Sequence, residues 1–166
     1  MKKTCLSLSV AVVIIMACQK TPEPAPVDLA AEEAVISVLF DKFDSAFFAR
    51  DVVALAAFLT EDALCLGTAP SEYMSKKQIT DTWTQLFLSD SAVELNYISE
   101  RKIKIAADGN SASVVDQYFM PGISPKIPWR NSYHLVKTSD NWKIDFLSCS
   151  FIPENEDIAK LNEALE

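Results

Sequence analysis

Histidine, cysteine and basic residues are scarce in this chain of 166 residues, and each shortage excludes a class of function. His134 is the only histidine, and the four cysteines are widely separated, so no metal-ligand spacing exists. We therefore expect no metal and no cofactor. The 15 Lys and Arg residues against 23 Asp and Glu give a formal net charge of −8. Such an acidic surface repels phosphate backbones, which argues against nucleic acid as a partner.

Long hydrophobic runs are absent except at the N-terminus, where residues 1–17 predict a secretory signal peptide. Two lysines give it a positive start, and the apolar residues 6–16 are too few to cross a bilayer comfortably. The segment Ile-Met-Ala-Cys at residues 15–18 resembles the lipobox of bacterial lipoproteins. That resemblance implies cleavage before Cys18 and acylation of this cysteine. An ordinary signal peptide or an uncleaved anchor is the alternative.

Cleavage at this position predicts a protein of the bacterial cell envelope, lipid-anchored at the outer membrane or the periplasmic face. The loss of two lysines moves the formal charge from −8 to −10, so lipid rather than charge would hold the protein to the membrane. Residues 18–27 contain three prolines and predict an extended tether. The cysteines left unmodified are Cys65 and Cys149. They could form a disulfide, but two buried free thiols are the favoured interpretation.

Three helices and one strand are predicted in the first half of the domain. Asp28 can cap a long amphipathic helix, and Asp51 can cap a second, short helix that ends near Thr60. Residues 63–66 form an apolar run too short for a helix, which predicts a strand. A third helix follows it. Its sequence signals are a capping box at Ser75 and Gln78, and an apolar stripe of Ile79, Trp83, Leu86 and Phe87.

The second half of the chain changes to the period of two that is typical of strands. Residues 93–97 and 102–105 alternate apolar and polar side chains, and Asp108-Gly109 predicts a tight turn into an antiparallel strand over 111–120. The remaining predicted elements are a proline-rich loop over 121–128, strands over 129–137 and 142–152, and a C-terminal helix over 153–166.

The separation of strands from helices predicts an α+β domain in which a curved antiparallel sheet wraps around the N-terminal helices. Three stretches carry a family resemblance: residues 46–63 with Arg50-Asp51 and Glu61-Asp62-Ala63, residues 67–83 with Gly67-Thr68 and Ser75-Lys76-Lys77-Gln78-Ile79, and Trp142-Lys143-Ile144. Together they resemble the SnoaL-like branch of the NTF2-like superfamily over residues 28–152. The resemblance implies a conical barrel with one deep, mostly apolar pocket, and a homodimer paired through the outer face of the sheet.

Asp116 and Tyr118 form the candidate catalytic pair. The resemblance implies isomerases, cyclases, hydratases or dehydratases that use a buried carboxylate or histidine, alongside members without catalysis. An apolar pocket moves the pKa of such a base toward working pH, and a donor faces the oxygen that gains charge. Alternation over 111–120 points both side chains inward. The alternative is that Asp116 lies outward or bonds a helix end. Asp44 is interpreted as a solvated residue.

His134 is the third catalytic candidate, as a general base or a hydrogen-bond donor. Alternation places it with Arg130, opposite the face of Trp129, Tyr133 and Leu135 that we expect to be buried. A solvated or satisfied strand histidine is therefore the preferred interpretation. If the faces are reversed, His134 becomes a pocket residue and the argument for an enzyme strengthens.

Five residues are predicted to line the pocket: Tyr73 at its mouth, Trp83 from the third helix, Tyr133, and Phe146 and Ser148 on the inward side of the last strand. Many relatives carry a histidine near the position of Ser148, and serine there weakens a transfer of their catalysis. The leading hypothesis is a membrane-anchored domain that binds a small, mostly apolar molecule. The alternatives are an acid–base enzyme acting on a carbonyl or hydroxylated ring compound, and a non-catalytic dimerisation or partner-binding module.

Overall fold

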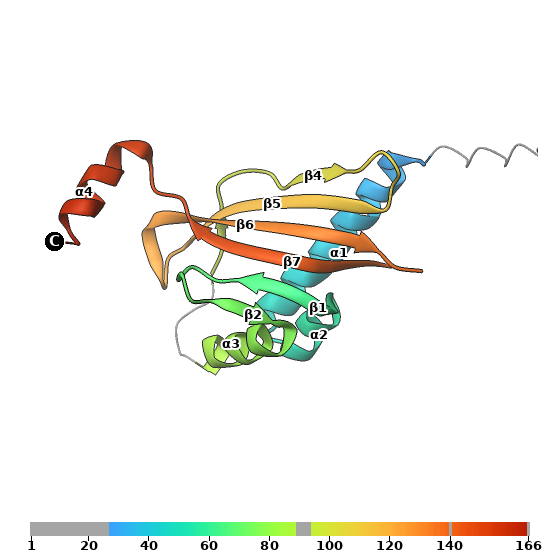
Figure 1. Cartoon of the computed structure of the whole chain (residues 1–166), viewed down its shortest axis with the longest axis horizontal. Coiled ribbons are helices and arrows are strands. Elements are labelled where there is room, and N and C mark those ends of the chain that lie inside the picture. The colour runs from blue at the N-terminus through green and yellow to red at the C-terminus, as the bar shows by residue number, and fades with distance from the viewer. Residues whose placement is uncertain (1–26, 89–93, 140, 166) are drawn as a thin grey trace, which may run out of the picture.

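The computed structural model of the chain describes residues 27–88, 94–139 and 141–165 (Figure 1). The predicted signal peptide, the predicted acylation site Cys18 and the predicted tether up to Pro26 lie outside the described residues. Within the described ranges, no helix is both long enough and apolar enough to cross a membrane.

Two capped helices begin the domain. Asp28 caps α1 (Leu29–Phe48) and Asp51 caps α2 (Val52–Ala57). Each carboxylate accepts a hydrogen bond from the backbone N–H three residues further on, at 3.1 and 2.9 Å respectively. Both predicted caps are confirmed. The second helix is shorter than predicted, because the strand β1 (Leu59–Leu66) begins where we expected the helix to continue.

The predicted capping box is confirmed at the start of α3 (Lys76–Leu88), directly after the edge strand β2 (Tyr73–Ser75). The backbone N–H of Ser75 donates to Oε1 of Gln78 at 2.9 Å, and the backbone N–H of Gln78 donates to Oγ of Ser75 at 3.4 Å. The helix then buries Ile79, Trp83 and Phe87.

In the described part of the chain, seven strands form one curved, open sheet in the order β2-β1-β7-β6-β5-β3, with β4 also on β5. The strands not yet introduced are β3 (Asn96–Tyr97), β4 (Lys102–Ile105), β5 (Ser111–Met120), β6 (Ser124–Lys137) and β7 (Trp142–Phe151). β1 pairs parallel to β7, whereas the other pairs are antiparallel. The expectation of a wholly antiparallel sheet is therefore wrong at this one pair, and the implied barrel does not close.

β6 begins inside the segment 121–128 that we predicted to be a loop. Pro125 and Pro128 therefore lie in a strand, although proline lacks the N–H that a regular ladder needs. The register of β6 with β5 shifts in this part of the ladder. An irregular ladder leaves fewer backbone hydrogen bonds for proline to interrupt, which explains why the strand tolerates both residues.

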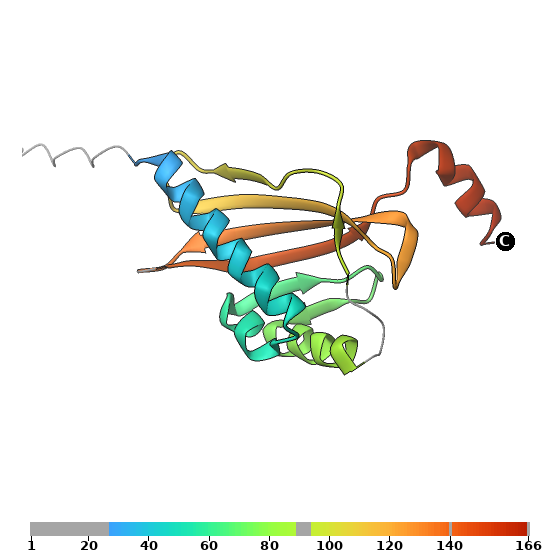
Figure 2. The ribbon, with the colours of Figure 1, turned by 180° about the vertical axis from the view of Figure 1, so that it is seen from behind.

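α1 lies across one face of the sheet and forms the core with it (Figure 2). Phe40 of α1 is fully buried, and its ring meets the ring of Tyr133 on β6 edge-on with centroids 4.8 Å apart. The short helix α4 (Ile158–Glu163) extends beyond the end of β7, away from this core (Figure 1). The α+β architecture predicted from the sequence is thus confirmed, as an open curved sheet with N-terminal helices.

Candidate functional site

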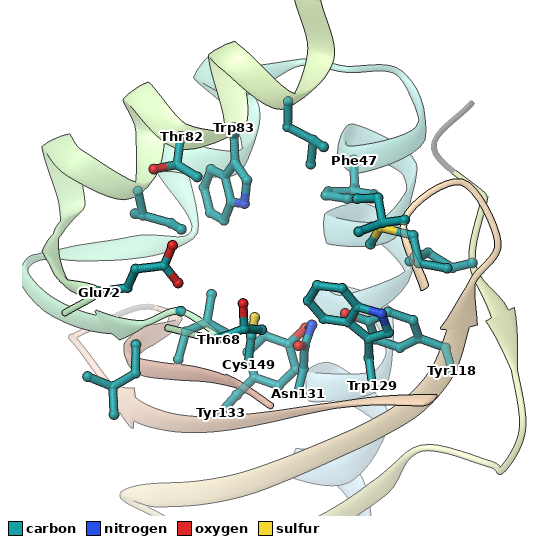
Figure 3. Close-up of a pocket in the computed structure, with 18 of the residues that line it drawn as sticks. Phe47, Thr68, Glu72, Thr82, Trp83, Tyr118, Trp129, Asn131, Tyr133 and Cys149 are labelled. Atoms are coloured by element: carbon teal, nitrogen blue, oxygen red, sulfur yellow. The ribbon is translucent and has the colours of Figure 1, made fainter. Parts of the chain in front are cut away.

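A cavity of about 230 Å³ lies between α1, α3 and the sheet (Figure 3). α1 supplies Phe43 and Phe47, which are four residues apart and so lie on one side of the helix. β6 supplies Trp129, Asn131 and Tyr133, which alternate toward the same face of the sheet. Large apolar side chains with a few polar groups are typical of small-molecule sites. The aromatic lining residues are Phe43, Phe47, Trp83, Tyr97, Tyr118, Trp129 and Tyr133.

Neutral polar groups gather on the strands that line this cavity. Nδ2 of Asn131 donates to the hydroxyl of Tyr133 at 3.0 Å, and Tyr118 stacks on Trp129 with ring planes 8° apart. Burial raises the pKa of both phenols. Burial also raises the pKa of the Cys149 thiol to about 12. These groups therefore offer hydrogen bonds but no charge at neutral pH.

Two carboxylates reach the cavity from the helices and loops. Asp44 comes from α1, and Glu72 comes from the loop before β2. The Glu72 carboxylate points into the cavity in Figure 3, and its Oε2 accepts a hydrogen bond from the backbone N–H of Ala69 at 2.9 Å. No Lys, Arg or His is found among the described residues that line the cavity.

Asp116 points inward as predicted, with 2% of its surface exposed, but its carboxylate is occupied by Arg101. Nε of Arg101 lies 2.7 Å from Oδ1 and Nη2 lies 3.1 Å from Oδ2, while the same Nη2 lies 2.8 Å from Oδ2 of Asp44. Burial raises the pKa of Asp116, and the guanidinium opposes that rise. Because both oxygens are hydrogen-bonded and Asp116 does not line the cavity, this geometry suits a structural ion pair better than a general base.

His134 lies on the opposite face of the sheet from the cavity. Its Nδ1 is 2.7 Å from Oδ1 of Asp145, and 42% of its side chain is exposed. The preferred interpretation of a partly solvated strand histidine is therefore confirmed. The structure brings Tyr118 into the cavity wall but does not bring His134 to it.

A β-bulge in β7 exchanges the two faces of this strand. The register with β6 shifts at Asp145, which is the extra residue. Because side chains alternate along a strand, one extra residue reverses the faces that follow it. Leu147 and Cys149 line the cavity as a result. The predicted inward positions of Phe146 and Ser148 are therefore wrong.

The other three predicted ligand residues have different outcomes. Trp83 and Tyr133 line the cavity, as the sequence suggested. Tyr73 does not, because it lies in the edge strand β2 with 69% of its surface exposed. Its neighbours Glu72 and Met74 line the cavity in its place. Because side chains alternate along β2, the residues on either side of Tyr73 face the cavity and Tyr73 itself faces away from it.

Sequence reasoning missed several lining residues that had a usable signal. Trp129 and Asn131 share the inward alternation of Tyr133 on β6. Asp44 follows Phe40 by four residues, which places it near the apolar stripe of α1 rather than in solvent. Glu72 had no such signal, because its orientation depends on the loop that folds back toward β1.

The two cysteines of the described domain are free thiols, and burial raises the pKa of Cys65 to about 11. Neither thiol is therefore an activated nucleophile. Across the residues that the structure describes, no group of three His, Cys, Asp or Glu side chains could hold a metal ion.

Comparison of the fold with solved structures finds similar proteins at low sequence identity. One from Pectobacterium atrosepticum, of unknown function, is 17% identical with a TM-score of 0.64, covering 79% of this chain and 98% of its own. An NTF2-like protein from Cytophaga hutchinsonii is 19% identical with a TM-score of 0.58, covering 72% and 98%. A provisionally assigned scytalone dehydratase from Novosphingobium aromaticivorans is 14% identical with a TM-score of 0.61, covering 75% and 87%.

Sequence comparison points to the same group of proteins. No curated protein matches this sequence. The sequence profile of the SnoaL-like domain matches residues 36–154, which run from the middle of α1 past the end of β7. The profile thus covers both the helices and the strands that build the cavity. The chain therefore belongs to the SnoaL-like domain family, whose NTF2-like fold it shares with the three solved structures.

Proposed function

We propose that this protein binds a small, mostly apolar molecule in the cavity between α1, α3 and the sheet, and that a lipid on Cys18 anchors it in the bacterial cell envelope. The observation that supports binding is the cavity itself, which is walled by aromatic rings and has few polar groups. Membership of the SnoaL-like family adds support, because domains of this kind typically form a ligand-binding cone.

A thermal-shift or native mass-spectrometry screen with small aromatic compounds tests the binding proposal. A ligand at a hundred times its Kd stabilises the native state by about 2.7 kcal/mol and so raises the melting temperature by several degrees. Thr82→Trp is the control, because Thr82 is exposed on α3 and faces the cavity, so the indole fills the space without disturbing the core (Figure 3). Binding that is absent from the wild type, or unchanged in the filled variant, contradicts the proposal.

The lipid anchor is supported by the sequence of residues 15–18 and has its own test. Labelling of producing cells with palmitate should mark the wild type, and the label should disappear in Cys18→Ala. Label that remains in the variant rules out Cys18 as the acylated residue. The ligand screen is independent of this result, since the cavity is built entirely from residues after the tether.

Acid–base catalysis on a carbonyl or hydroxylated ring compound is a second candidate function. The observation that favours it is the pairing of a cavity carboxylate, Asp44, with the phenols of Tyr97 and Tyr118 in one apolar space. The Novosphingobium protein carries a dehydratase name, but likeness at 14% identity supports the fold alone. If a substrate is found, Asp44→Asn should lower turnover by about a hundredfold or more and leave binding largely unchanged. Equal turnover in the variant excludes Asp44 as the base.

The homodimer implied by the family resemblance stays a prediction. The outer face of the sheet carries Leu64, which is 44% exposed, beside Phe146 on the paired strand β7. Light scattering of the wild type and of Phe146→Glu tests this surface. A dimer that persists in the variant, or a wild-type monomer at high concentration, argues against it.

A further inference from the structure

The charged side chains in the cavity wall are both acidic within the part of the chain that the structure describes. Asp44 and Glu72 line the cavity. Arg101 stands behind Asp44 and is shared with Asp116, so this group of two carboxylates and one guanidinium keeps a net negative charge. Glu72 adds a second negative charge, and the wall as a whole is therefore anionic.

Glu72 forms no ion pair with any described cation. Its Oε2 accepts a hydrogen bond from the backbone N–H of Ala69 at 2.9 Å, which satisfies one oxygen without balancing the charge. The carboxylate faces the cavity on the side of α3 (Figure 3). Burial is the main cause of the raised pKa of the Cys149 thiol on β7, and the Cys65 thiol and the charge of Glu72 raise this pKa further. The negative charge of Glu72 therefore acts on a group in the sheet wall. The carboxylate and the cavity therefore share one electrostatic environment.

Aromatic rings surround the space that Glu72 faces. Trp83 approaches from α3, and Trp129 lies across the cavity on the sheet (Figure 3). A cation is attracted to the face of an aromatic ring, and indole is the strongest partner. The same attraction already operates inside this domain, where Cζ of Arg101 lies 4.5 Å from the ring centroid of Phe40.

An anionic ligand finds no described positive group in the same wall. The phenols of Tyr118 and Tyr133 can donate hydrogen bonds, but they stay neutral and cannot balance a charge. Bringing a carboxylate next to Glu72 in an apolar cavity removes its hydration and adds repulsion. A protonated amine meets a carboxylate, aromatic faces and apolar walls together. The two ligand charges therefore have opposite energetics in this cavity.

We infer that the cavity selects an organic cation, namely a protonated amine with an apolar, ring-bearing body, over neutral and anionic molecules of the same shape. This inference rests on the proposed binding function and adds the charge class of the ligand. Glu72 is the specificity-determining residue, because its carboxylate faces the cavity and has no cation partner among the described residues.

Three ligands with the same ring test the inference by isothermal titration or quenching of tryptophan fluorescence at neutral pH and low salt. They are 2-(1-naphthyl)ethylamine, 2-(1-naphthyl)ethanol and the carboxylate anion of 1-naphthaleneacetic acid. We expect the amine to bind about tenfold more tightly than the alcohol, and the carboxylate about tenfold more weakly than the alcohol. Raising the salt concentration should weaken the amine and leave the alcohol unchanged, since screening acts on the charged ligand alone.

Glu72→Gln tests the assigned residue, because the amide keeps an oxygen for the Ala69 N–H and loses the charge. It should lower the affinity for the amine about five- to tenfold and leave the affinity for the alcohol within about twofold. Glu61→Gln is the matched control, since its carboxylate is 94% exposed, pairs with Lys76 and does not line the cavity. It should change none of the three affinities by more than about twofold.

The outcomes separate this inference from the proposal on which it rests. Equal affinity for the three ligands overturns the cation selectivity, and an amine affinity that Glu72→Gln leaves unchanged overturns the assignment of Glu72 as its source. Binding of the alcohol upholds the proposed function in either case. Failure of all three ligands to bind overturns both.

Discussion

The cavity has two walls of different chemistry. The polar and aromatic residues of the sheet wall include Tyr118, Trp129, Asn131, Tyr133 and Cys149. The helix-and-loop wall includes Asp44, Thr68, Glu72, Thr82 and Trp83. The sheet wall is neutral and lies in strands paired on both sides, whereas the other wall carries the charge and includes the exposed residues Thr68 and Thr82. The sheet therefore determines the shape of the cavity, while the helices and loops determine its electrostatic preference.

The largest effect should come from Arg101, which links α1 to β5 through its ion pairs with Asp44 and Asp116. Arg101→Leu leaves the buried Asp116 and the half-buried Asp44 without their shared cation. Breaking such a buried pair costs about 3–5 kcal/mol of unfolding free energy, measured by urea denaturation. Lys77→Met, which removes an exposed pair with Asp81, should cost less than about 0.5 kcal/mol. Similar losses in the two variants would remove the distinction between core and surface ion pairs here.

A smaller effect should separate the two faces of β7. Leu147→Ala removes a side chain that is 3% exposed on the sheet beside the cavity, and should cost about 2–3 kcal/mol. Phe146→Ala alters the outer face and should cost about 1 kcal/mol or less in the monomer. Chemical denaturation of both variants measures the difference. A greater cost at Phe146 would show that Phe146, rather than Leu147, faces the core.

Tyr133→Phe should have an intermediate effect on the sheet wall. The variant keeps the ring that meets Phe40 but removes the hydroxyl that accepts the hydrogen bond from Asn131. Leaving the half-buried amide of Asn131 without this partner costs about 1–2 kcal/mol. Thermal unfolding measures the loss, and Tyr73→Phe, at an exposed edge position, is the control. If both variants unfold at the wild-type temperature, the polar group on the sheet wall contributes no stability.

The smallest effect on stability should come from the helix-and-loop wall. Glu72→Gln keeps the backbone hydrogen bond and removes a charge that no described cation balances, so unfolding free energy should change by about 0.5 kcal/mol or less. A loss near 2 kcal/mol would show that Glu72 is a structural residue. Stability that is preserved while amine affinity falls is the result that sharpens the contrast between the two walls.

Local signals made much of the fold predictable from the sequence. Asp28, Asp51 and the capping box at Ser75 are each set by residues within one turn, and the structure contains all three. The turn at Asp108-Gly109 is equally local, since Gly109 adopts a φ of +68° that favours glycine. Long-range pairing was less accessible. The parallel contact of β1 with β7 joins residues far apart in the sequence, and no local pattern specifies it.

The candidate site shows the same limit at the level of single residues. Alternation correctly placed Asp116 inward, but it could not show that Arg101, in the segment between β3 and β4, would occupy the carboxylate. Alternation also failed for Phe146 and Ser148, because a bulge breaks the period of two without changing the composition of the strand. Periodicity predicts which side a residue faces only while the pairing register stays regular.

Asp145 has an influence on both surfaces of the sheet at once. Its insertion turns Leu147 and Cys149 toward the cavity, and its Oδ1 lies 2.7 Å from Nδ1 of His134 on the other face of the sheet. Deletion of this one residue from a related sequence would change both the side chains that line the cavity and the ion pair on the outer face of the sheet. Homologues that lack a residue at the position of Asp145 should therefore be treated as a distinct subtype, even when the neighbouring residues are identical.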